Sequence, residues 1–134
     1  MKHQTDFLEL LQIDYEKYPV IAVVGGGGKT SLIYRLTDEL LDRGKRVIIT
    51  TTTHMAGETE LPFVRGGDAV KVQETLDREG YVIAAEYEEE TGKYASLEEG
   101  KLEELKKLCD VMLVEADGAK HHPVKVPAEW EPVI

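Results

Sequence analysis

Short unbroken runs of apolar residues alternate along this chain with longer segments in which apolar residues recur every three or four positions. Unbroken runs between turn signals are typical of strands that are buried on both faces of a parallel sheet. Spacings of three and four are typical of helices with one buried face. The pattern predicts four strands, at residues 20–24, 46–50, 81–86 and 111–114.

Four helices are predicted around these strands. Asp68 has the residue type of a helix N-cap, and Gly80 that of a C-terminal stop. Ser96 and Glu99 have the spacing of a capping box. A turn at residues 91–93 predicts a hairpin tip after the third strand. The predicted helices span about residues 5–17, 69–79 and 97–108, and a further one begins within residues 25–28 and runs to residue 43.

The most informative segment follows the first predicted strand directly. It consists of four glycines and a Lys-Thr-Ser sequence: Gly25, Gly26, Gly27, Gly28, Lys29, Thr30 and Ser31. Glycines let successive backbone N–H groups turn toward one anion, and the N-terminus of the following helix adds its positive dipole end. Lys29 supplies a cation for terminal phosphates, and the Thr30 hydroxyl is a candidate Mg²⁺ ligand. The segment therefore predicts a nucleotide-binding loop.

This loop departs from the standard Walker pattern, because Val23 stands where that pattern has its first glycine. Read as Gly25-x-x-Gly28-Lys29-Thr30, it is two residues shorter and resembles the loop of the Mur ligases and of folylpolyglutamate synthase. The alternative is a plain glycine-rich turn with a solvated lysine. Strand, glycines, Lys-Thr and amphipathic helix occur together, and this combination favours phosphate binding.

A second segment combines an apolar strand with acidic residues. Residues 111–114 lead into Glu115, which has the form of a Walker B strand whose acid holds the Mg²⁺ shell. We therefore predict Thr30 and Glu115 as metal ligands. Asp117 is predicted to orient a water or accept a proton, so that Lys29 and Asp117 are the candidate catalytic residues. The alternative for both acids is a solvated loop position.

Candidate substrate contacts lie after the second and fourth strands. Thr52 and Thr53 end the second strand, where hydroxyl groups can donate to phosphate oxygens, and His54 follows them. Lys120 and Lys125 are predicted to contact an anionic substrate. Extended-chain propensity for the threonines, and solvated roles for the histidine and lysines, remain the alternatives.

Net charge and composition limit the partners of this chain. The formal net charge of −10 argues against nucleic-acid or anionic-membrane binding, so a phosphate site requires local positive charge from Lys29, with Arg35 or Lys120 nearby. No run approaches the roughly 20 apolar residues of a membrane span, and the N-terminus lacks the pattern of a signal peptide. The single cysteine, Cys109, suits a reducing compartment. We expect a cytoplasmic protein without membrane or nucleic-acid partners.

Helices alternating with apolar strands predict an α/β fold, a three-layer P-loop NTPase-like sandwich with a mostly parallel sheet. The 134 residues predict a single nucleotide-binding domain at 1–134. Parallel strands place the loops after strands one, two and four at the carboxyl edge of the sheet, where ligands bind. Because four strands are few for this fold, we expect the N-terminal part of a longer protein.

Together these motifs resemble the YqeC family, whose members are named as accessory proteins of selenium-dependent molybdenum hydroxylases. The resemblance rests on three segments, at residues 25–31, 50–55 and 114–127, and the last contains its most distinctive sequence, Glu-Ala-Asp-Gly-Ala-Lys followed by Pro-x-Lys-x-Pro. The resemblance implies partners among the molybdenum hydroxylases or their cofactor-maturation proteins, and a chain that extends further. It implies a pathway and leaves the reaction open.

We expect an Mg²⁺-dependent nucleotide-binding and nucleotide-hydrolysing accessory protein for hydroxylase maturation. ATP is favoured over GTP as the nucleotide, because the guanine-reading Asn-Lys-x-Asp motif is absent and the chain contains no asparagine. One alternative is a Mur-ligase-like ATP-dependent ligase or phosphotransferase. Another is a non-catalytic nucleotide or cofactor carrier that docks on the hydroxylase through its acidic face.

Overall fold

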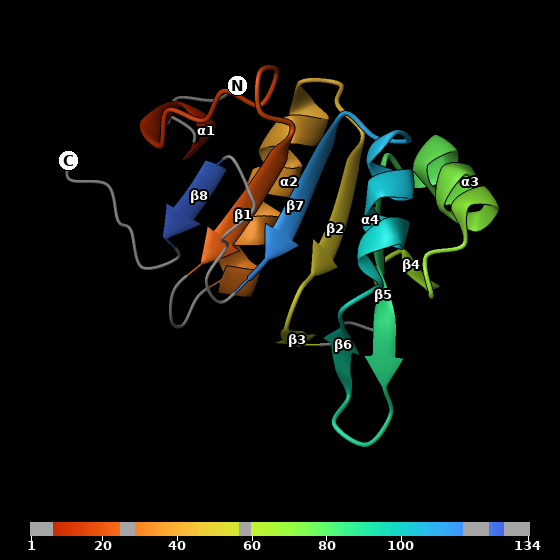
Figure 1. The fold of residues 1–134 in the computed structure, drawn as a ribbon. Helices are drawn as coiled ribbons and strands as arrows, with labels where there is room; N and C mark the ends of the chain where they lie inside the picture. The colour runs from red at the N-terminus through yellow and green to blue at the C-terminus, as the bar shows by residue number, and fades with distance from the viewer. Residues whose placement is uncertain (1–6, 25–28, 57–59, 117–123, 128–134) are drawn as a thin grey trace.

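The structure is a computed structural model that describes residues 7–24, 29–56, 60–116 and 124–127. Four strands occupy the segments that the apolar runs predicted: β1 (Val20–Val24), β2 (Val47–Thr51), β5 (Tyr81–Glu88) and β7 (Val111–Glu115). Four shorter strands accompany them: β3 (His54–Ala56), β4 (Phe63–Arg65), β6 (Lys93–Ala95) and β8 (Val124–Pro127). These described strands form one sheet (Figure 1).

The sheet is mixed, which corrects the expectation of a mostly parallel one. Its strand order is β3-β6-β5-β2-β7-β1-β8, and β4 also pairs with β5. Neighbours from β5 to β8, and the β4–β5 pair, run parallel, whereas β6 is antiparallel to both β5 and β3. The reason is local: β5 turns straight back into β6, and a short hairpin joins only antiparallel strands.

The β5–β6 hairpin confirms the turn predicted at residues 91–93. Gly92 adopts a φ of 69°, which favours glycine, and its N–H donates to the Glu88 carbonyl at 2.8 Å. Tyr87 pairs with Tyr94 across the hairpin, and both rings pack on Phe63, with ring centroids 4.8 to 6.2 Å apart. This aromatic contact supports the hairpin where it extends beyond the central strands (Figure 1).

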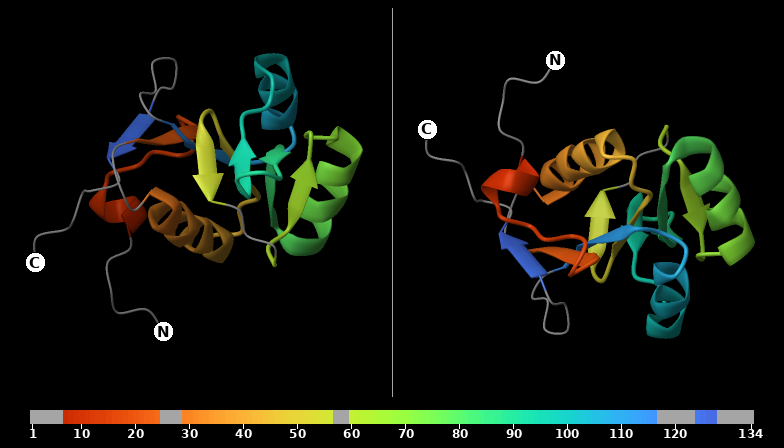
Figure 2. Two further views of the ribbon diagram at one scale, coloured as in Figure 1. Left: turned by 90° about the horizontal axis from the view of Figure 1, so that it is seen from below. Right: turned by 90° about the horizontal axis from the view of Figure 1, so that it is seen from above.

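Helices cover both faces of the sheet. The described helices are α1 (Phe7–Leu10), α2 (Lys29–Asp42), α3 (Ala69–Glu79) and α4 (Glu99–Lys106). In both views of Figure 2, α2 and α4 lie on opposite sides of the strands. Alternate strand residues divide accordingly: Ile21 and Val23 pack in the core on the α2 side, and Val20 and Ala22 pack in the core on the α4 side. None of the described helices has the length and apolar character needed to span a membrane.

Both predicted ends of α3 are confirmed. The Asp68 carboxylate accepts the N–H groups of Val70 and Lys71 at 3.0 and 3.2 Å. Gly80 adopts a left-handed φ of 88° and donates its N–H to the Leu76 carbonyl. Both contacts lie within a few residues of the helix end, and sequence patterns record such local contacts well.

The predicted capping box of α4 is wrong. Glu98 stands at the N-cap without a side-chain cap, and the Ser96 hydroxyl donates instead to the Leu97 carbonyl at 2.9 Å. Leu97 is buried against Gly67, where a Cβ would lie 3.0 Å from the leucine side chain. Leu97 packs against this glycine, and α4 begins at Glu99, later than the capping pattern indicates.

The first helix is also much shorter than predicted. It ends at Leu10, and Gln12 follows with a φ of 56°. The turn buries both Leu8 and Ile13. The buried carboxylate of Glu39 on α2 accepts the N–H groups of Phe7 and Leu8, each at 2.9 Å, so a partner distant in sequence holds the start of this helix. The predicted cap, Thr5, lies outside the described residues.

Candidate functional site: the carboxyl edge of the sheet

Lys29 and Thr30 form the first residues of α2, which follows β1 after a connection of four residues. Both side chains are half-buried, whereas Ser31 is exposed. The first N–H groups of a helix have no intrahelical partners and carry the positive end of its dipole. The strand-to-helix placement predicted for Lys29 and Thr30 is present. The glycines predicted to bind phosphate, Gly25–Gly28, lie outside the described residues.

Glu115 ends β7 on the same edge of the sheet. In register it stands between Val23 of β1 and Thr51 of β2. Val23 belongs to the core on the α2 side, and residues directly opposite one another in neighbouring strands share a face. Glu115 therefore lies on the face of the sheet that α2 covers, and only 5% of it is exposed.

Thr51 connects the ends of β2 and β7. Its fully buried hydroxyl lies 3.0 Å from the Glu115 carbonyl oxygen and 3.3 Å from the Glu115 carboxylate Oε1. The same hydroxyl accepts the N–H of Thr53 at 3.0 Å, and the Thr52 N–H donates to the Glu115 carbonyl at 3.0 Å. These bonds hold the buried carboxylate and the chain that follows β2 in one arrangement.

The neighbouring Thr50 differs in both face and partners. It is equally buried, but its hydroxyl has no hydrogen-bond partner among the described residues. Strand alternation sends successive side chains to opposite faces, so Thr50 lies on the α4 side and Thr51 on the α2 side. Thr51 is the functional candidate that sequence reasoning did not single out. Alternation along β2, aligned with Glu115, was the signal that could have identified it.

The side chains of Thr52 and His54, two predicted substrate contacts after β2, do not gather around Glu115. Thr52 is exposed and lines a groove on the α4 side of the sheet. His54 is exposed on β3, and its Nε2 lies 3.0 Å from Oε2 of Glu88 on the hairpin. That hydrogen bond is the main cause of the lowered pKa of Glu88. Thr53 contributes its backbone N–H to the Thr51 hydroxyl.

The positively charged candidates are only partly described. Asp117 and Lys120 lie outside the described residues, and Lys125 stands in β8, in register with Ala22 of β1. Arg35, named as a source of local positive charge, is engaged on α2 and α1. Its Nε donates to the Glu39 carboxylate at 3.0 Å, and its guanidinium stacks 4.6 Å from the centre of the Phe7 ring.

A comparison of the whole chain with protein families bears on these motifs. The model of the family described as YqeC protein matches residues 21–134. The chain belongs to the YqeC family. The uncharacterised protein YqeC of Escherichia coli strain K12 is 38% identical over 130 residues, which cover 93% of this chain and 51% of that relative. The chain thus spans about half the length of the YqeC relative that it matches.

No solved structure matches this chain significantly. The P-loop NTPase-like fold expected for this YqeC chain therefore stays a prediction, which rests on its own residues, above all Lys29, Thr30 and Glu115. The family match confirms the resemblance that the three motif segments indicated, at the level of the family alone.

The oxygen atoms at this edge suit a magnesium ion better than a transition metal. Within the described residues, no group of three or more His, Cys, Asp or Glu side chains could hold a metal ion. Mg²⁺ usually binds one or two carboxylates and completes its shell with water and substrate phosphates. The Thr30 hydroxyl and the Glu115 carboxylate are hard oxygen donors of the kind that Mg²⁺ prefers.

Proposed function

We propose that this chain binds an Mg²⁺–nucleotide complex at the carboxyl edge of its sheet and hydrolyses the nucleotide, with ATP favoured over GTP. The observation that carries the proposal is the placement of two groups on one face. Lys29 and Thr30 open α2, and buried Glu115 ends β7, against which α2 packs. A cation, a hydroxyl and a carboxylate so disposed are the parts that phosphoryl-transfer sites use.

Each residue has a separate role in this proposal. Lys29 and the N-terminal amides of α2 bind the terminal phosphates, and Gly25–Gly28 extend that anion pocket. Thr30 and Glu115 hold the Mg²⁺, which would neutralise charge that develops on the phosphates. Thr51 keeps the Glu115 carboxylate in place through its hydroxyl. Asp117, two residues beyond Glu115, orients the attacking water.

Nucleotide-dependent stabilisation tests the binding step. A ligand at 100 times its Kd adds about 2.7 kcal/mol to the free energy of unfolding, which for a chain of this size raises Tm by about 10 °C. We expect this shift with Mg²⁺–ATP in a panel that also contains GTP and CTP. Lys29→Ala should abolish the shift, and Glu115→Gln should remove the part that depends on Mg²⁺.

Lys71→Ala is the matched control, because Lys71 is an exposed lysine on α3, outside the proposed site. It should retain the full shift. An equal Mg²⁺–ATP shift in wild type and Lys29→Ala would contradict the proposal. A second assay tests nucleotide hydrolysis. It compares phosphate release by the wild type with release by Glu115→Gln and by Lys71→Ala.

The same assays separate the other candidate functions. Phosphate release without any acceptor supports a hydrolase, whereas ADP release only with an acceptor supports a Mur-ligase-like ligase or a phosphotransferase. Binding without turnover supports a nucleotide carrier. The link to maturation of a selenium-dependent molybdenum hydroxylase comes from the resemblance of the motif segments. Co-purification of this chain with a molybdenum hydroxylase or its cofactor-maturation proteins would support it.

A further inference from the structure

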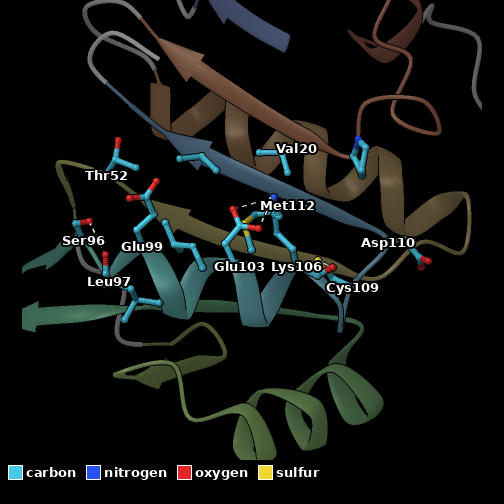
Figure 3. Close-up of a pocket in the computed structure, with 13 residues that line it drawn as sticks. Val20, Thr52, Ser96, Leu97, Glu99, Glu103, Lys106, Cys109, Asp110 and Met112 are labelled. Atoms are coloured by element: carbon cyan, nitrogen blue, oxygen red, sulfur yellow. Dashed lines mark hydrogen bonds and ion pairs between the residues drawn. The ribbon is translucent and has the colours of Figure 1, made fainter. Parts of the chain in front are cut away.

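A groove of about 510 Å³ runs along α4 on the face of the sheet opposite Glu115 (Figure 3). Its apolar lining comes from both walls. Val20 of β1 and Met112 and Val114 of β7 form the sheet side, while Leu97 and Leu102 form the α4 side. Apolar cavities of a few hundred cubic ångströms with a polar rim are typical of binding sites.

The groove is long enough to bind a short helix alongside α4. Thr52 and Ser96 line one end and Cys109 and Asp110 the other, so the groove follows the whole of α4 (Figure 3). Eight helical residues correspond to a length of about 12 Å, or two to three turns. A bound segment of that length would present three or four side chains to the floor, at positions i, i+3, i+4 and i+7.

Among the described residues, no helix covers the sheet at this position. Parallel strands are normally covered by helices on both faces. On one face, α2 packs against β1, β7 and β2, whereas on the other α3 packs on β5 and beside α4 (Figure 2). The groove lies next to α4, over β1 and β7, where a further helix of this layer would stand at the usual spacing of about 8–10 Å.

The rim of the groove is acidic. Glu99 and Glu103 extend from α4 toward the gap, and Asp110 lies at the far end (Figure 3). Lys106 is the one basic residue among the described residues that line the groove, and its Nζ lies 3.1 Å from the Glu103 carboxylate. A groove with this surplus of carboxylates disfavours nucleotides and other anions, and complements an apolar segment with Lys or Arg at its edges.

We propose that this groove seats an amphipathic helix with basic edges, supplied by the half of the YqeC polypeptide that lies outside the matched region. The E. coli relative contains about as much chain outside the match as inside it, because the match covers 51% of its length. Covering the groove would complete the helical layer over β1 and β7 and would bury Leu102 of α4, which is only partly buried in this chain. This inference is independent of nucleotide binding at the opposite face.

Photo-crosslinking in the intact E. coli relative tests the occupant directly. A photoreactive residue at the position aligned with Leu102 is expected to crosslink, within one molecule, to a segment outside the matched half. That segment should have apolar residues every three or four positions and Lys or Arg beside them. The position aligned with Val70, which is 67% exposed on α3 in this chain, is the control and should give no such crosslink.

A synthetic peptide of the crosslinked segment then tests the groove of this chain by calorimetric titration. Leu102→Asp places a charge on the apolar lining and should weaken binding at least about tenfold. Glu99→Lys should weaken it about fivefold and flatten its salt dependence, because like charges then meet at the rim. Val70→Asp should leave the affinity unchanged. The Tm of each variant verifies that it remains folded.

Three outcomes would overturn the inference. The first is a Leu102-position crosslink confined to the matched half or joining two molecules. The second is a crosslinked segment that is acidic or lacks an apolar face. The third is peptide binding that is absent at 100 µM, or that Leu102→Asp and Val70→Asp weaken equally.

Discussion

The two faces of the sheet are built differently, although the same strands supply both. On the α2 face, the helix buries Ile33, Leu36 and Leu40 completely, and the strand ends close in the hydrogen bond between Thr51 and Glu115. On the α4 face, the helix buries one residue, Leu105, and leaves an apolar groove beside it. The closed face carries the candidate chemistry, and the open face carries a surface suited to a partner helix.

The largest expected difference between the faces is in core packing. Leu36→Ala should lower the free energy of unfolding by about 3–4 kcal/mol, because the fully buried site leaves a cavity. Leu102→Ala should cost about 1 kcal/mol or less, because Leu102 is only partly buried beside an open groove. Urea denaturation of both variants measures the two values. Equal losses would show that the α4 face is as closed as the α2 face.

The adjacent threonines give a second contrast. Thr51→Val should destabilise the fold by about 1–3 kcal/mol, because it removes a buried hydroxyl that serves both Glu115 and Thr53. Thr50→Val replaces a buried hydroxyl without a described partner. It should lower the free energy of unfolding by about 0.5 kcal/mol at most, or raise it. Thr51→Ser, which keeps the hydroxyl, is the control. Similar losses for the two valine variants would remove the distinction between the faces.

The reactivity of Cys109 reports on the solvent access of one end of the α4 groove, which this residue lines. Burial raises the pKa of this thiol to about 12, so at pH 8 the native chain contains little of the reactive thiolate. We expect alkylation by iodoacetamide at pH 8 to be at least about tenfold slower in the native chain than in urea, and to accelerate as the pH approaches 12. Equal native and unfolded rates at pH 8 would mean that this end of the groove admits water freely.

The smallest effect is expected at the hairpin, outside both faces. The pKa of exposed Glu88 is lowered chiefly by its hydrogen bond with His54, so its carboxylate stabilises the fold when ionised. This contribution is present above the unfolded pKa of a glutamate and is lost as the pH falls through the lowered pKa. Glu88→Gln should lower Tm slightly at pH 6, and the difference should vanish near pH 2. A difference that persists at low pH would contradict this assignment.

Features that depend on neighbouring residues were predictable from sequence. The four long strands follow from apolar runs, the ends of α3 from Asp68 and Gly80, and the hairpin from the turn at Gly92. Each depends on side chains or dihedral preferences within a few positions. A helix after the first strand follows equally from the sequence, because the glycines lead into an amphipathic pattern.

Features that depend on distant residues were not predictable in the same way. The capping pattern at Ser96 fails where Leu97 packs on Gly67, and α1 is held by Glu39, about thirty positions away along the chain. The pairing of β3 with β6 requires two short strands that carry no distinct pattern of their own. Propensity is a weak signal wherever such tertiary contacts compete with it.

In the candidate site, too, local features were predictable from the sequence and contacts between distant residues were not. The sequence alone determined its ingredients, a Lys-Thr pair after the first strand and an acid after the fourth, because residue type and spacing carry that information. Only the tertiary structure decided that Thr51 contacts Glu115 while Thr52 and Thr50 belong to the other face, and that the α4 side retains a groove. The physical reason is that strand register, which sets the face of every side chain, is chosen by pairing between segments more than sixty residues apart.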